Sequence, residues 1–201
     1  IPDGVVNIIT GDGTTGSLIV NHKDINKIAF TGSTQVGKLI QKSLAGRDVG
    51  LTLELGGKAA NIVYEDAAID QAVEGVVNGI FFNQGHVCCA GSRLLLQESI
   101  HDEFITKLEK RMQTLRVGNP LDKNTDIGAV NSKEQLNKIE ELVNEGVSDG
   151  GKIFQTECEL PGNGFWFKPT LFTDVQPSYS IAREEIFGPV LTTLTLSLIH
   201  I

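Results

Sequence analysis

The alternation of short apolar runs with segments of helical periodicity is the feature that most constrains the fold of this chain. The runs that predict strands lie at residues 5–9, 28–30, 51–55, 60–64, 93–97, 152–155 and 171–175. Between them, apolar residues recur every three to four positions, as at Val36, Ile40 and Leu44, which is typical of amphipathic helices. Strands that alternate with helices favour an α/β fold built on parallel sheets.

Two helices in the second half of the chain carry sequence signals for their ends. Ser99 with Asp102, and Ser132 with Gln135, have the spacing of capping boxes, in which the first side chain accepts a hydrogen bond from a backbone N–H three residues later. Gly146 is expected to end the helix that Ser132 begins, because glycine is common just after a helix C-terminus. These signals predict helices at residues 100–115 and 133–145.

Charge and composition exclude several classes of function. The 17 basic and 25 acidic residues give a net charge of −8 without a cluster of lysine and arginine, so neither nucleic acid nor a membrane surface is an expected partner. No apolar run reaches the ~20 residues of a membrane span. The three cysteines cannot form a disulfide framework, which indicates a reducing compartment, and we expect the cytoplasm.

Two glycine-rich segments each follow an apolar run and precede a predicted helix. Residues 11–16 match the G-x-G-x-x-G pattern of dinucleotide-binding loops, and residues 32–37 form a second packet. Either segment could direct backbone N–H groups at a pyrophosphate, and either could be a plain turn between strand and helix. The second is better placed, because Ser33 and Thr34 add hydroxyl groups at the helix start and no acidic residue follows the first packet at the position that would hold a ribose.

The segment 81–93 contains two adjacent cysteines, Cys88 and Cys89, after a turn that includes glycine. Metal binding is a poor interpretation, because the segment has no C-x-x-C pattern and Cys158 is the only other thiol. A nucleophilic thiolate and a pair of buried, inert cysteines remain as alternatives on spacing alone. His86 could act as a base for Cys88 or be an ordinary polar loop residue.

Four motifs together resemble the NAD(P)-dependent aldehyde dehydrogenases in order and spacing. They are Phe30-Thr31-Gly32-Ser33-Thr34-x-Val36-Gly37, Leu53-Glu54-Leu55-Gly56-Gly57-Lys58, Phe82-Asn83-Gln84-Gly85-x-x-Cys88 and Glu184-Glu185-Ile186-Phe187-Gly188-Pro189. The resemblance implies an α/β, parallel-sheet aldehyde dehydrogenase-like fold that is truncated at both ends. Residues 1–56 would form the C-terminal part of the NAD(P)-binding domain, and residues 57–195 an incomplete catalytic domain.

The resemblance implies that Cys88 is the nucleophile and Glu54 the general base of an aldehyde oxidation. The thiolate would add to the aldehyde, the thiohemiacetal would lose a hydride to the nicotinamide, and water activated by Glu54 would hydrolyse the thioester to a carboxylic acid. An exposed carboxylate at a strand end is the alternative for Glu54. Cys89 matches a neighbouring position that varies, and His86 stands where many family members have Gln.

The resemblance also implies a cofactor site for NAD or NADP, and no metal. Gly32 to Gly37 would lie beside the pyrophosphate and nicotinamide, Glu185 and Phe187 would hold the nicotinamide ribose and ring, and the first glycine packet would lie near the adenosine. The implied cofactor-binding residues are Gly13, Gly32, Ser33, Thr34, Gln35, Val36, Gly37, Leu55, Glu185 and Phe187.

Two other functions stay open beside the oxidation of a small-molecule aldehyde. One is acyl transfer to coenzyme A, although family members with that activity commonly lack the glutamate that matches Glu54. The other is a non-catalytic scaffold, although a scaffold needs neither Cys88 nor Glu54. The family's oligomerisation segment would lie downstream, so we expect the parent protein to be a homo-oligomer.

Both ends of the sequence have the character of a fragment. Ile1 precedes an apolar run without an initiator methionine, and residues 196–201 are either a non-native tail, which we expect, or a genuine strand. The asparagine that completes the family's oxyanion site and the residues that read the ribose 2′ position would lie upstream of Ile1. We therefore expect this fragment to be inactive alone, and the sequence does not distinguish NAD from NADP or identify the aldehyde.

Overall fold

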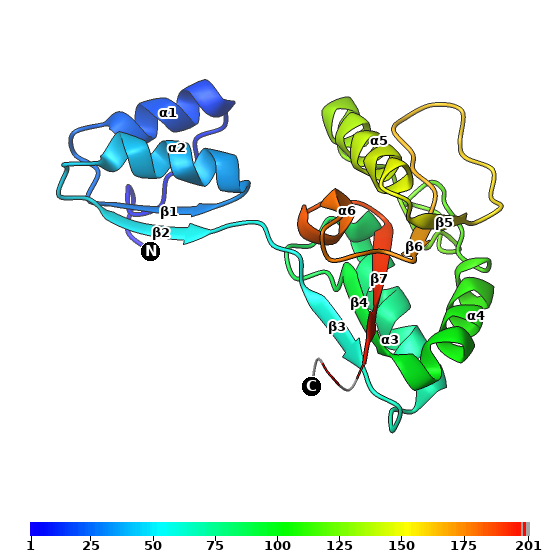
Figure 1. Ribbon diagram of the computed structural model, residues 1–201. Coiled ribbons are helices and arrows are strands. Elements are labelled where there is room, and N and C mark those ends of the chain that lie inside the picture. Colours follow the sequence, from blue (N-terminus) through cyan, green and yellow to red (C-terminus); the bar gives the residue numbers. More distant parts are fainter. Residues whose placement is uncertain (198, 200–201) are drawn as a thin grey trace. The chain divides into compact units, whose positions relative to one another are not determined.

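The chain divides into two units, Ile1–Gly56 and Gly57–Ile201, in a computed structural model that describes residues 1–197 and 199 (Figure 1). The division falls between two consecutive glycines, Gly56 and Gly57, where the sequence analysis expects a seam. Each unit has its own sheet and its own buried side chains. The two are described separately below.

The first unit is a two-stranded parallel sheet with two helices on one face. Its elements are α1 (Gly13–Asn21), β1 (Lys27–Thr31), α2 (Thr34–Leu44) and β2 (Gly50–Glu54). β1 and β2 pair from Lys27↔Gly50 to Thr31↔Glu54, and α1 and α2 lie on the same side of them in Figure 1. The buried apolar side chains are Val20, Ile28, Ile40 and Leu44. The strands predicted at residues 28–30 and 51–55 are confirmed, although β2 ends at Glu54.

The strand predicted at residues 5–9 is wrong. The four apolar side chains of this run are exposed, from 64% for Val5 to 88% for Ile8. The Val5 N–H donates only locally, to the Pro2 carbonyl. Strand backbone needs a neighbouring strand for its N–H and C=O groups, and no strand within residues 1–197 and 199 pairs with this run. Residues 5–9 therefore have the apolar composition of a buried strand, but no described strand offers them backbone hydrogen bonds.

A five-stranded sheet forms the centre of the second unit. Its strands, in spatial order, are β3 (Ala60–Val63), β4 (Arg93–Gln97), β7 (Val190–Leu196), β6 (Thr170–Thr173) and β5 (Lys152–Gln155). β3, β4, β7 and β6 are parallel, whereas β5 is antiparallel to β6. The expectation of a wholly parallel sheet is wrong for β5, because a loop at 156–169 joins it to β6 where a parallel pair would need a helical crossover.

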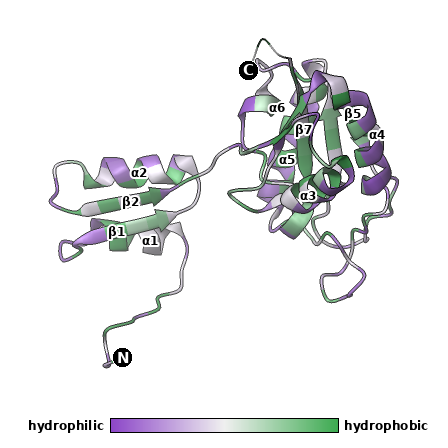
Figure 2. Cartoon of the chain, turned by 90° about the horizontal axis from the view of Figure 1, so that it is seen from below, coloured by the Kyte–Doolittle hydropathy of each residue, from purple (hydrophilic) through white to green (hydrophobic). Residues whose placement is uncertain are grey.

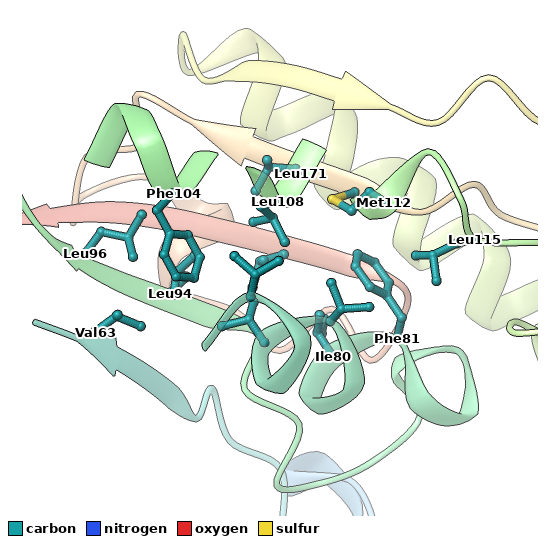
Figure 3. Packing of buried hydrophobic residues seen from close by; sticks show 14 of the residues in the cluster. Val63, Ile80, Phe81, Leu94, Leu96, Phe104, Leu108, Met112, Leu115 and Leu171 are labelled. Atoms are coloured by element: carbon teal, nitrogen blue, oxygen red, sulfur yellow. The ribbon is translucent and has the colours of Figure 1, made fainter. Parts of the chain in front are cut away.

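Helices cover both faces of this sheet. Side chains alternate along a strand, so neighbouring residues of β4, β7 and β6 point to opposite faces. Leu94, Leu191 and Leu171 pack with α3 (Ile69–Phe81) and α4 (His101–Met112), as Figure 3 shows for this cluster. Val190 and Phe172 pack instead with α5 (Lys133–Ser148) and α6 (Ser180–Arg183). In Figure 2 the strands are mostly hydrophobic and the outer surface of α4 is hydrophilic, as this arrangement requires.

One of the two predicted capping boxes is wrong and the other is half confirmed. Ser99 lies in a short 3-10 helix, η2 (Glu98–Ile100), and its hydroxyl donates to Glu65 Oε2 at 2.7 Å instead of capping α4. Ser132 does cap α5, since its Oγ accepts from the Gln135 N–H at 3.1 Å. The Gln135 side chain, however, does not return to the cap and binds elsewhere.

Gly146 does not end α5, which continues to Ser148. A Cβ at Gly146 would lie 2.7 Å from Ile181 Cδ1, so this glycine allows α5 to approach α6 closely. The left-handed glycine after the helix is Gly150, with φ of +106°. A glycine does follow the end of α5, but it is Gly150 and not Gly146. Gly146 lies inside the helix, where its small size permits the packing against α6.

The last strand, β7, includes the first residue of the segment 196–201 that is expected to be a non-native tail. Leu196 is the final residue of β7 and pairs with Gln97 of β4. Leu198, His200 and Ile201 lie outside the described residues, so the non-native origin of 196–201 stays a prediction. None of the helices within residues 1–197 and 199 has the length and hydrophobicity needed to cross a membrane.

Candidate active site

A turn with unusual backbone geometry presents the cysteine pair at the end of α3. The 3-10 helix η1 (Phe82–Gly85) follows α3 directly, and Asn83, Gln84 and Gly85 all have positive φ, at 49°, 46° and 75°. The His86 N–H donates to the Asn83 carbonyl at 2.9 Å, and Asn83 Nδ2 donates to the His86 carbonyl at 3.1 Å. These bonds close the turn and offset the cost of its left-handed residues.

Cys88 and Cys89 are free and exposed. The alternative in which both cysteines are buried is therefore wrong, and both thiols are accessible to solvent. The Ala90 N–H donates to the Val87 carbonyl at 2.9 Å, which folds the chain back around Cys88. Within the part of the chain that the structure describes, the Cys88 N–H donates to no acceptor. A thiolate at this position can attack a carbonyl carbon. The free N–H group beside it can then donate a hydrogen bond to the oxyanion that forms.

Gly91, two residues after the cysteine pair, connects the cysteine turn to α3 and β3. The Gly91 N–H donates to the Gly79 carbonyl at 3.2 Å, and Asn61 Nδ2 donates to the Gly91 carbonyl at 3.1 Å. A Cβ at Gly91 would collide with the Asn61 side chain. The turn is thus fixed both to α3 and to β3.

The segment that contains Glu185 and Phe187 is held by Gln135, which the sequence analysis assigned only to a helix cap. Gln135 Nε2 donates to the Ile186 carbonyl at 2.8 Å and to the Phe187 carbonyl at 3.0 Å. Phe187 has a φ of 55°, and Ile186 is buried in the core below it. Glu185 and Phe187 are half-buried, so each side chain keeps some exposure. The 51 residues between Gln135 and Ile186 explain why spacing could not reveal this contact.

The structure brings the cysteine turn and this segment together. A Cβ at Gly85 would collide with the Gly188 carbonyl oxygen, so the two backbones are in close contact. The rings of His86 and Phe187 stack, with centroids 5.2 Å apart and planes inclined by 5°. Two predicted site residues, Cys88 and Phe187, therefore belong to one rigidly supported cluster.

Lys58 is a buried amine that the motif includes but that was assigned no role from sequence. Its Nζ is buried and, among residues 1–197 and 199, has no hydrogen-bond partner. Burial and, to a smaller extent, the positive charge of Arg93 lower the pKa of Lys58 to about 8, although the negative charge of Glu185 acts in the opposite direction. Lys58 is thus linked electrostatically to Glu185, one of the predicted cofactor residues.

Glu54, Leu55 and the second glycine packet meet in the first unit. Glu54 is exposed at the carboxyl end of β2, and its carbonyl accepts from the Gly32 N–H at 3.0 Å. A Cβ at Gly37 would lie 2.6 Å from Leu55 Cδ2, so Gly37 lets α2 pack against the residue that follows Glu54. The residue predicted as general base is therefore joined through its backbone to the predicted pyrophosphate segment, and its side chain is open to water.

The start of α2 has the features of an anion site. Ser33 is the N-cap, and its Oγ accepts from the Val36 N–H at 3.3 Å. Thr34, Gln35 and Val36 form an exposed first turn of this 11-residue helix. The N–H groups at a helix N-terminus and the helix dipole favour negative charge.

A largely apolar cavity of about 550 Å³ lies between α1, α2 and β1, entirely within the first unit. Gly13 and Gly16 line it, and a Cβ at either position would meet no atom within 4 Å. Asp12 caps α1 by accepting from the Thr14 N–H at 2.9 Å, and the hydrogen bonds from Thr14 lower the pKa of its carboxyl. The first packet therefore borders a cavity, and its Asp12 is occupied by the helix cap.

The predicted residues fall into two groups. Glu54, Leu55, Gly13 and the Gly32–Gly37 segment belong to the first unit, whereas Cys88, Glu185 and Phe187 belong to the second. Among residues 1–197 and 199, no group of three His, Cys, Asp or Glu side chains could hold a metal ion.

Comparisons with known proteins cover nearly the whole chain. Residues 1–199 match the model of the aldehyde dehydrogenase family. Retinal dehydrogenase 2 of Taeniopygia guttata is 50% identical over 195 residues, which are 94% of this chain and 37% of that protein. An aldehyde dehydrogenase of Emericella nidulans is 47% identical over 95% of this chain and 39% of its own length. The chain thus spans about two-fifths of the length of these relatives.

Solved structures give the same result for the fold. The NAD-dependent aldehyde dehydrogenase of Sinorhizobium meliloti superposes with a TM-score of 0.95 and 39% identity, over 100% of this chain and 40% of that chain. An aldehyde dehydrogenase of Bacillus cereus, in complex with NAD+, superposes with a TM-score of 0.94 and 39% identity, over 100% of this chain and 41% of its own. The α/β fold inferred from the sequence is confirmed, and the chain belongs to the aldehyde dehydrogenase family.

Proposed function

We propose that this chain is part of an enzyme that oxidises an aldehyde to a carboxylic acid with NAD+ or NADP+. Cys88 is the nucleophile and Glu54 the general base. The observation that carries this proposal is the turn that exposes Cys88 beside a free backbone N–H and against the Phe187 segment. The 39% identity to an enzyme solved with NAD+ supports the same class of cofactor.

Cys88 begins the reaction by adding its thiolate to the aldehyde carbon. A C–S bond forms, and the carbonyl oxygen becomes an oxyanion that the Cys88 N–H can stabilise. A nicotinamide cofactor held by Glu185 and Phe187 would supply the acceptor for the hydride that this thiohemiacetal loses. A thioester on Cys88 remains, and Glu54 takes a proton from the water that attacks it. The carboxylic acid leaves, and the Cys88 thiolate is restored.

Each unit contains residues that would fit part of a dinucleotide. The apolar cavity beside Gly13 suits an adenosine, because it is lined by apolar side chains and two glycines leave it open. The first turn of α2, from Ser33 to Val36, suits the pyrophosphate. Glu185 and Phe187 would hold the nicotinamide ribose and ring. The positive charge of Lys58 would partly balance the negative charge of Glu185.

The cysteine pair provides the experiment that tests the proposal. In the full-length enzyme, Cys88→Ser is expected to abolish aldehyde-dependent reduction of NAD+ or NADP+ and to leave cofactor binding nearly unchanged. Cys89→Ser is the matched control, because the neighbouring thiol is equally exposed, and most activity should remain. An inactive Cys89→Ser beside an active Cys88→Ser would show that the nucleophile is assigned to the wrong cysteine.

A further inference from the structure

The ring contact between His86 and Phe187 has no part in the chemistry above. The two rings are nearly parallel, at 5° and 5.2 Å between centroids, which lies within the range of favourable offset stacking. His86 is half-buried, and its Nε2 is buried without a hydrogen-bond partner among residues 1–197 and 199. The interaction that the structure shows for this imidazole is therefore the stacking of its face on Phe187, and not a hydrogen bond from Nε2.

Each ring is anchored independently of the other. The His86 backbone is held by its N–H and its carbonyl, both bonded to Asn83. The Phe187 backbone is held by Gln135, at a φ of 55° that leaves little freedom. The contact between Gly85 and the Gly188 carbonyl fixes the spacing of the two backbones. The stack is therefore set by three separate constraints.

The protonation state of His86 agrees with a stacking role. Burial lowers the pKa of His86, which favours the neutral imidazole. A neutral ring stacks without bringing an unpaired charge into the contact. His86 is also two residues from Cys88, yet no hydrogen bond joins the two side chains in the described part of the chain.

We propose that His86 is a positioning residue, whose ring packs on one face of Phe187 and fixes that side chain for contact with the nicotinamide. This inference rests on the proposed function, in which Phe187 holds the nicotinamide ring. His86 then acts through Phe187 and touches neither the substrate nor the reacting atoms. A flat ring at position 86 is the property that matters, and its nitrogens are not.

Two variants of the full-length enzyme separate the ring from the nitrogens. His86→Ala removes the ring and is expected to raise the KM for the cofactor by about 2- to 12-fold, the factor that corresponds to one aromatic stacking contact. The primary isotope effect with an aldehyde deuterated at C1 should increase, because hydride transfer is then less well aligned. His86→Phe keeps a flat ring and should restore both quantities. His101→Ala, which removes a histidine with no ring contact on Phe187, is the control and should change neither.

A spectroscopic measurement on the protein without cofactor tests the stack itself. The imidazole C–H resonances of His86 should shift when Phe187→Leu removes the ring current, while those of His101 should not. If they do not shift, the stack is absent in solution and the proposal fails.

The outcomes also distinguish this inference from the proposed function. Equal behaviour of His86→Ala and His86→Phe, in an enzyme that still needs Cys88, would overturn the positioning role and leave the proposed function intact. Aldehyde oxidation that survives Cys88→Ser would instead overturn the proposed function, and the assignment of Phe187 with it.

Discussion

The two units of this chain differ in how completely their sheets are covered. The second unit covers both faces of its three central strands, β4, β7 and β6, with α3 and α4 on one side and α5 and α6 on the other. The first unit has two strands and a buried cluster of four residues, and apolar residues such as Leu39 stay more than half exposed. Parallel strands are normally covered on both faces, so the first unit has the less complete core.

The two proposed catalytic residues also belong to different units. Cys88 lies in the unit with the larger core, where α3, β3 and the Phe187 segment support it. Glu54 lies at a strand end of the smaller unit, beside the segment proposed for the pyrophosphate. The proposed nucleophile and the proposed general base therefore depend on different parts of the fold. This comparison leads to three predictions.

The largest effect is expected when the carboxylate of the first unit is removed. In the full-length enzyme, Glu54→Gln should slow thioester hydrolysis by about 10²–10⁴-fold, the usual contribution of a general base. Formation of reduced cofactor should then show a burst followed by slow turnover, and mass spectrometry should detect acylated Cys88. Asp48→Asn is the control, because it removes an exposed carboxylate from the same unit. Full steady-state activity of Glu54→Gln would remove this residue from the mechanism and favour acyl transfer to another acceptor.

The second prediction compares the two cores. Phe104→Ala should lower the free energy of unfolding of the second unit by about 3–5 kcal/mol, because this side chain is fully buried in a closely packed cluster. Ile28→Ala should cost the first unit about 2 kcal/mol, since its partly open surroundings can collapse around the change. Hydrogen exchange of the amides in β4 and β1 measures each effect separately. If either substitution accelerates exchange equally in both strands, the units unfold together and the comparison fails.

The smallest effect concerns two serines of the second unit. Ser132→Ala removes the cap of α5 and should cost about 1 kcal/mol in denaturant unfolding. Ser99→Ala removes a hydroxyl that binds the exposed Glu65 and should change stability by less than about 0.5 kcal/mol. The reverse order would mean that the η2 turn stabilises the start of α4 more than its hydrogen bonds indicate.

The sequence predicted those elements whose signals are local. β4 and β5 begin and end at the predicted residues 93–97 and 152–155, because each strand contains a short apolar run between polar residues. The run at 5–9 has the same composition but no strand beside it, and pairing cannot be read from one segment. The same limit explains the error at Ser99, whose partner Glu65 lies 34 residues away.

The candidate site shows the same difference between local signals and contacts of distant segments. The motifs predict Cys88, Glu54 and Phe187 as site residues, since their residue types stand in a recognisable order. They did not reveal that Gln135 holds the Phe187 carbonyl or that the Lys58 amine is buried near Glu185. Those are contacts between distant segments, and only the folded arrangement of β4, α5 and the loop before β7 creates them.

The contact of Gly85 with the Gly188 carbonyl has a consequence for how an enzyme of this kind can diversify. The spacing between the Cys88 turn and the Phe187 segment is set by a contact of main chain with main chain, without a side chain between them. Mutations in the surrounding side chains can therefore reshape a substrate pocket while that spacing is preserved. Position 85 tolerates almost no change, because a larger residue would both clash with the Gly188 carbonyl and require a φ of 75°.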